Sequence, residues 1–64
     1  MNTVWQFVDR IVDWEGYITK EEIRSLHRTK EGAEKAMEAW REMYPLLATW
    51  KGARQFVQEV VVLD

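Results

Sequence analysis

Hydrophobic residues in the middle of the chain recur at spacings of three and four, with charged residues between them. This spacing is typical of an α-helix with one apolar stripe. Thr29 is a suitable N-cap, and Glu31 lies in the first turn, where the helix dipole favours a negative charge. Pro45 predicts that the helix ends near Met43 or Tyr44, because the residue before a proline is pushed out of the helical region. The stripe consists of Ala33, Ala36, Met37, Trp40 and Tyr44.

Two segments near the ends of the chain have the composition of β-strands. Residues 4–14, VWQFVDRIVDW, place valines on one face and larger apolar side chains on the other. Residues 56–64, FVQEVVVLD, are rich in β-branched residues and follow Gly52. Both segments are apolar on both faces, and such strands need cover on two sides.

The stretch from residue 15 to residue 28 has two interpretations. In the first, Glu15 and Gly16 form a turn, and the chain returns as a strand through Ile23 and Leu26. The chain is then a β-hairpin followed by a helix and a last strand. We favour this interpretation, because it gives the first strand a natural partner.

The alternative is a mainly α-helical protein with a long central helix. Thr19 and Glu22 have the spacing of a capping box, and Ile18 with Ile23 that of a hydrophobic staple. Gly32 would then lie inside the helix, at a cost of about 1 kcal/mol.

The favoured fold is a single α+β domain over residues 1–64, with the order β-hairpin, helix, strand (ββαβ). A right-handed crossover places the last strand beside the first, so the antiparallel sheet has the strand order 2-1-3. One helix covers only one face of such a sheet. The uncovered face carries large apolar residues, and we expect it to meet a second copy, as a homodimer, or a different protein.

Composition excludes several classes of protein. The chain has no cysteine and one histidine, so neither a disulfide nor a thiolate metal site can form. Nine basic against eleven acidic residues give no basic face, and direct nucleic-acid binding is not expected. The longest apolar run, Val60–Leu63, is too short to cross a membrane, and the N-terminal residues do not form a signal peptide. We expect a cytoplasmic protein without a metal or cofactor.

Residues 13–23, DWEGYITKEEI, are similar to the latter part of an EF-hand calcium loop. Gly16 falls at the sharp turn and Glu22 at the bidentate last position. Ile11, however, stands where the first carboxylate ligand belongs. A calcium-binding module is therefore a weaker alternative than a turn flanked by solvated acids.

No pattern of residues indicates catalysis. His27 has no nucleophile motif near it. Asp9, Asp13 and Glu15 could supply an acid–base pair, but they are better explained as groups that keep the hairpin solvated. We expect a protein that is not an enzyme.

The aromatic residues fall into two groups. Trp40 lies on the apolar stripe of the helix and is expected in the core. Trp14, beside the turn with Tyr17, and Trp50, close to Arg54, are harder to bury. Aromatic rings beside arginines can grip a partner protein or stack on bases. The candidate contact residues are Trp5, Phe7, Trp14, Tyr17, Arg28, Trp50 and Arg54.

The opening VWQFVDRIVDWEGY, the junction SLHRTKEGAEKAMEAW and the ending FVQEVVVLD resemble a set of small phage-encoded proteins of about this size. In that set a hydrophobic strand leads into a capped helix of the T-x-E-x-A kind, and a short acidic-ended strand closes the chain. The resemblance implies a phage accessory protein in the bacterial cytoplasm. Such a protein would inhibit a host or defence protein, as an anti-CRISPR does, or hold a nucleotide signal.

The sequence thus predicts a non-enzymatic binding or inhibitory protein. Its working surface is either the sheet face away from the helix or the turn end around Trp14, Tyr17 and Trp50. In the alternative function, a nucleotide or other small ligand is held between aromatic and arginine side chains at a subunit interface.

Overall fold

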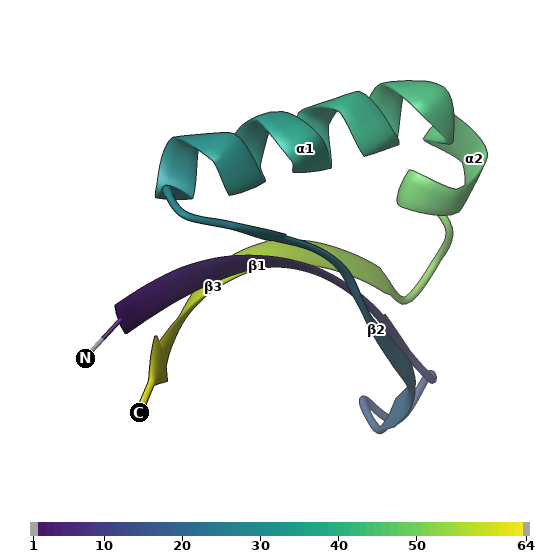
Figure 1. Ribbon diagram of the computed structural model, residues 1–64. Helices are drawn as coiled ribbons and strands as arrows, with labels where there is room; N and C mark the ends of the chain where they lie inside the picture. Colours follow the sequence, from purple (N-terminus) through teal and green to yellow (C-terminus); the bar gives the residue numbers. More distant parts are fainter. Residues whose placement is uncertain (1, 64) are drawn as a thin grey trace.

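A three-stranded antiparallel sheet carries a long helix on one face (Figure 1). The computed structural model describes residues 2–63, and its strand order is β2-β1-β3. The α+β hairpin–helix–strand fold and the 2-1-3 order are therefore confirmed. The long central helix is not supported, because residues 18–27 form a strand. The elements are β1 (Asn2–Val12), β2 (Ile18–His27), α1 (Lys30–Met43), α2 (Pro45–Ala48) and β3 (Ala53–Val62).

The turn between β1 and β2 is held by one aspartate. Asp13 Oδ1 accepts hydrogen bonds from the backbone N–H groups of Glu15 and Tyr17, both at 2.9 Å. Gly16 supplies the positive φ of 91° that the turn needs. Thr19 caps no helix, because its hydroxyl donates to the carbonyl of Ile11 at 3.1 Å. These local bonds favour the hairpin over the helix.

Helix α1 begins and ends where its sequence predicts. The hydroxyl of Thr29 accepts a hydrogen bond from the Gly32 N–H at 3.0 Å. The chain leaves the helical conformation at Tyr44, and Pro45 then begins the four-residue helix α2. Proline suits a first helical position, because it has no N–H that would be left unpaired. Helix α2 was not predicted.

The core between helix and sheet is small. Phe7 of β1 is 2% exposed and packs edge-on against Trp40 of α1, with 5.8 Å between the ring centroids. Ala33, in the first turns of the same helix, is fully buried. Most of the other large apolar side chains keep some exposure to solvent.

The opposite face of the sheet is concave, and no helix or strand within residues 2–63 covers it (Figure 1). Its centre is nevertheless shielded by the chain's own polar side chains. The guanidinium of Arg10 lies 4.7 Å from the ring centroid of Phe56, and Gln58 donates a hydrogen bond to Gln6 at 2.7 Å. Val8, between them, has no exposed surface. The large bare apolar face expected from the sequence is therefore reduced at its centre.

Candidate functional site

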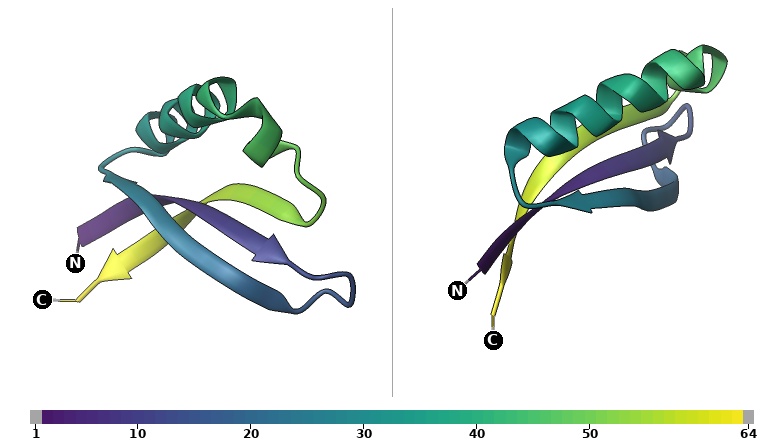
Figure 2. Two further views of the ribbon diagram at one scale, coloured as in Figure 1. Left: turned by 90° about the vertical axis from the view of Figure 1, so that its right-hand side faces the viewer. Right: turned by 45° about the horizontal axis from the view of Figure 1, so that its top comes forward.

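Exposed apolar side chains gather at the end of the molecule opposite the two termini. Figures 1 and 2 show α2 and the β1–β2 turn at this end. Trp14 is 87% exposed, Leu46 85% and Trp50 65%. Such fractions are unusual for large apolar residues that lie close together. We call this surface the apolar end and define it as Trp14, Met43, Tyr44, Leu46, Leu47 and Trp50.

A close backbone contact brings the two exposed tryptophans to one place. The N–H of Val12 donates to the carbonyl of Gly52 at 2.9 Å, so the segment before β3 lies directly against the end of β1. Gly52 has a φ of 91°, and a Cβ there would lie 2.2 Å from the carbonyl oxygen of Val12. Only glycine allows this approach. The contact forms a groove of about 470 Å³ lined by Val12, Asp13, Trp14, Trp50, Lys51, Gly52 and Arg54.

Trp50 connects this groove to two others. One, of about 470 Å³, runs along α2 and is bordered almost entirely by apolar side chains. The other, of about 220 Å³, lies between Trp50, Leu47 and the sheet. Trp50 is therefore the central residue of the apolar end. The groove along α2 is lined by Met43, Tyr44, Pro45, Leu46, Leu47 and Trp50.

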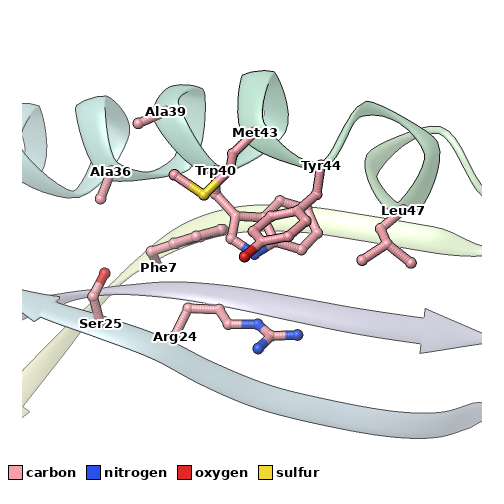
Figure 3. A pocket seen from close by; sticks show the side chains of 9 residues that line it. All are labelled: Phe7, Arg24, Ser25, Ala36, Ala39, Trp40, Met43, Tyr44 and Leu47. Carbon is pink, nitrogen blue, oxygen red and sulfur yellow. The ribbon is translucent and has the colours of Figure 1, made fainter.

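A further groove of about 550 Å³ lies between α1 and β2 (Figure 3). Arg24 reaches it because a β-bulge leaves this residue unpaired between Ile23 and Ser25. Its guanidinium lies 5.6 Å from the Trp40 ring centroid and forms ion pairs with Asp9 at 3.1 Å and, at 3.0 Å, with Glu22. The charge of Arg24 is thus already balanced, which makes this groove a poor site for an anionic ligand.

Glu22 is held ionised by its neighbours. A hydrogen bond from Lys20, followed by the charge of Arg24, lowers the pKa of this carboxyl. Asp9, which the sequence placed among solvated acids, is instead 9% exposed and paired with Arg24. Lys20 Nζ lies 3.1 Å from Glu22. These charges form one network on the helix side of β2.

Lys51 and Arg54, the two cations beside the exposed tryptophans, differ from Arg24 in their ion pairing. Within residues 2–63, no acidic side chain forms an ion pair with Lys51 or Arg54. Arg54 donates one hydrogen bond, to the carbonyl of Ala53 at 2.9 Å. Asp13 lines the same groove, but its Oδ1 is occupied by the backbone of the turn. The groove therefore carries an excess of positive charge.

The structure separates the predicted contact residues. Trp14, Trp50 and Arg54 line one groove, and Tyr17 is 68% exposed on the neighbouring turn. Arg28 lies elsewhere, in a groove with residues 2–4.

The two aromatic residues of β1 among the contact candidates differ in their accessibility. Trp5 is half-buried, with the ammonium of Lys30 5.9 Å from its ring centroid. Phe7 cannot contact a partner in this fold, because it forms the core against Trp40.

Some residues of interest were missed by sequence reasoning. Leu46 and Leu47 belong to the apolar end, and the run PLLATW after the main helix was the signal for them.

Ser25 Oγ lies 2.7 Å from His27 Nε2. These two residues are alternate neighbours on one strand, whose side chains share a face. The contact is therefore a local one.

The residues of the predicted calcium loop do not converge. Asp13 caps the turn, while Glu22 is paired with Lys20 and Arg24 on the helix side of the sheet. Among the residues that the structure describes, no three histidine or acidic side chains are close enough to hold a metal ion. The calcium alternative gains no support.

Comparisons with protein-family models, curated proteins and solved structures gave no match to this chain. Neither helix within residues 2–63 has the length and apolar composition needed to cross a bilayer.

Proposed function

We propose that this chain is a non-enzymatic protein-binding module and that the apolar end is its contact surface. The observation that supports this is the clustering of Trp14, Leu46 and Trp50, each at least 65% exposed, around connected grooves. Tryptophan and tyrosine dominate the energetics of interfaces, because they bury large areas while losing little side-chain entropy.

The chemistry of the apolar end defines the kind of partner. A leucine- and methionine-lined groove suits an apolar ridge or helix of another protein. Lys51 and Arg54, in the adjoining groove that shares Trp50, suit acidic residues beside that ridge. A phage accessory protein that inhibits a host or defence protein, as the resemblance suggests, would act through such a surface.

Replacing Leu46 by glutamine should abolish capture of the partner without unfolding the chain. Leu46 is 85% exposed, so its loss from the free protein should change stability by no more than about 0.5 kcal/mol. If Leu46 is buried in the interface with the partner, the loss of its side chain should weaken binding at least tenfold, which is about 1.4 kcal/mol of binding free energy. The measurement is affinity capture from a bacterial host extract with the immobilised protein, followed by titration of the captured protein.

The matched control is Ile23→Gln. Ile23 is 57% exposed but lies on β2, opposite Val8 on the uncovered sheet face. It should retain the partner at wild-type affinity. Equal capture by both variants, or loss with Ile23→Gln alone, would show that the apolar end is not the contact surface.

A second candidate function is favoured by one specific observation. Two exposed tryptophans and two cations without ion-pair partners in the described chain share one groove, as an anionic aromatic ligand such as a nucleotide requires. If a nucleotide binds, it should raise the thermal midpoint. A ligand that binds only the folded state, at a concentration one hundred times its dissociation constant, raises the free energy of unfolding by about 2.7 kcal/mol. The measurement is a thermal-shift series with mono-, di- and cyclic nucleotides.

The control variants are Arg54→Gln and Arg28→Gln. Arg54→Gln should remove the thermal shift, whereas Arg28→Gln, in a different groove, should leave it intact. If no nucleotide shifts the midpoint of the wild-type protein, the ligand hypothesis is wrong.

A further inference from the structure

The outer edge of β3 is open. The strand order β2-β1-β3 makes β2 and β3 the two edges of the sheet, and within residues 2–63 no segment pairs with the outer side of β3. Natural proteins protect such edges with charges and bulges. The β2 edge has both: Lys20, Glu21, Glu22 and Arg24 are charged, and the ladder has two register shifts.

The β3 edge has no comparable protection. Its ladder with β1 runs without a register shift over its ten residues. From Gln55 to Val62 the strand carries one charged residue, Glu59. A long, regular and apolar edge of this kind is a template for another strand.

One hydrogen bond shows which residues of β3 point their backbone N–H and C=O groups away from β1. Val12 donates to Gly52, which continues the β1–β3 register, so even-numbered residues of β3 point their N–H and C=O groups toward β1. Odd-numbered residues point theirs outward. Gln55, Val57 and Glu59 therefore present their donors and acceptors to an incoming strand.

We infer that the occupant of this edge is a second copy of the chain, paired antiparallel through β3 about a two-fold axis at Val57. Residues directly opposite each other in an antiparallel pair must share a face. This register meets that condition and aligns the outward-pointing groups of Gln55, Val57 and Glu59, giving about six backbone hydrogen bonds. It joins two three-stranded sheets into one continuous sheet.

Side chains favour this register over one with its axis at Glu59. Val57 meets the other copy's Val57, and each Gln55 lies opposite a Glu59, whose carboxylate can accept from the glutamine amide. Moving the axis to Glu59 would place two carboxylates opposite each other, which is destabilising. The edge is thus complementary to itself, which is why we choose a second copy over a foreign strand.

The helices leave room for the pairing. Three strands are about 14 Å wide at their usual spacing, and one helix with its side chains is about 10–12 Å across. Two α1 helices can therefore lie side by side on one face of the joined sheet. Antiparallel pairing also sends the two apolar ends in opposite directions, so both remain free for a partner.

The test is the solution mass by light scattering across a dilution series. The wild-type chain should have twice the 7.7 kDa mass of one chain. Glu59→Pro should have the mass of one chain, because proline removes an outward N–H that makes no hydrogen bond to β1 and blocks the edge. The matched control is Glu21→Pro, which places the same residue at an outward position of the β2 edge and should remain dimeric.

A single introduced cysteine tests the register, since the chain has none of its own. Opposite residues of a hydrogen-bonded pair have Cα atoms about 5.5 Å apart, within disulfide reach. Oxidised Val57→Cys should therefore form a covalent dimer, and Glu21→Cys should not. A wild-type chain that stays monomeric up to millimolar concentration, or a Glu59→Pro variant that stays dimeric with circular dichroism unchanged, would overturn the inference.

This inference is independent of the protein-binding proposal. Glu59→Pro changes the mass and leaves the apolar end in place, whereas Leu46→Gln changes partner capture and leaves the mass unchanged. Failure of one proposal is therefore distinguishable from failure of the other.

Discussion

Replacing Gly52 by alanine should leave most of the chain unfolded at room temperature. The added Cβ would lie 2.2 Å from the backbone oxygen of Val12, which cannot move aside as a flexible side chain would. The residue also has a φ of 91°, which non-glycine residues rarely adopt. We expect a cost above about 4 kcal/mol, against a total of roughly 3–5 kcal/mol for a domain of this size without disulfides. The measurement is urea denaturation followed by circular dichroism.

Gly16→Ala separates the steric effect from the conformational one. Gly16 has the same φ of 91°, but an added Cβ there has no atom within 4 Å. This variant should lose only about 1–2 kcal/mol, the cost of a left-handed conformation, and stay folded. If both variants lose the same amount, the close contact between Gly52 and Val12 does not control the fold.

The loss of Gly52 should also separate the two tryptophans of the apolar end. Trp14 and Trp50 are far apart in the sequence, and the Gly52–Val12 contact is what brings their segments together. The sequence alone identified both rings as hard to bury. It could not show that they share a groove, because that depends on the close backbone approach at one glycine.

The order of the strands was predictable from local patterns and connection rules. The choice between hairpin and helix for residues 15–28 depended on a weaker signal. The capping-box spacing of Thr19 and Glu22 was real, but in the structure Asp13 accepts two hydrogen bonds that close the turn. Aspartate at the start of a turn, followed by a glycine, is a signal that could have decided the question from the sequence.

The shielding of the uncovered sheet face by polar side chains could not be predicted from local patterns. Its apolar residues follow from strand alternation, yet Arg10 and the Gln6–Gln58 pair shield its centre. Which polar side chain lies over which ring depends on the register between β1 and β3, and that register involves residues distant in the sequence. The bulge that turns Arg24 toward Trp40 is a similar case. These features favour the turn end over the sheet face, the two contact surfaces that the sequence left open.

Replacing Phe7 by alanine should unfold the chain, whereas replacing Trp14 should not. Both were candidate contact residues, but Phe7 is 2% exposed and Trp14 87%. Removal of a buried phenylalanine ring costs about 3–5 kcal/mol, which equals the whole stability expected for this domain. The edge-on contact with Trp40, at 5.8 Å between centroids, would be lost as well. Trp14→Ala should change the free energy of unfolding by about 0.5 kcal/mol or less.

The comparison uses urea denaturation of both variants, with Phe7→Leu as an intermediate. Leucine keeps part of the buried volume and should recover a folded chain with reduced stability. Partner capture then reports on function: Trp14→Ala should bind more weakly while remaining folded, and Phe7→Leu should bind with wild-type affinity. A stable Phe7→Ala variant, or a Trp14→Ala variant that unfolds, would reverse the assignment of these two rings to core and contact surface.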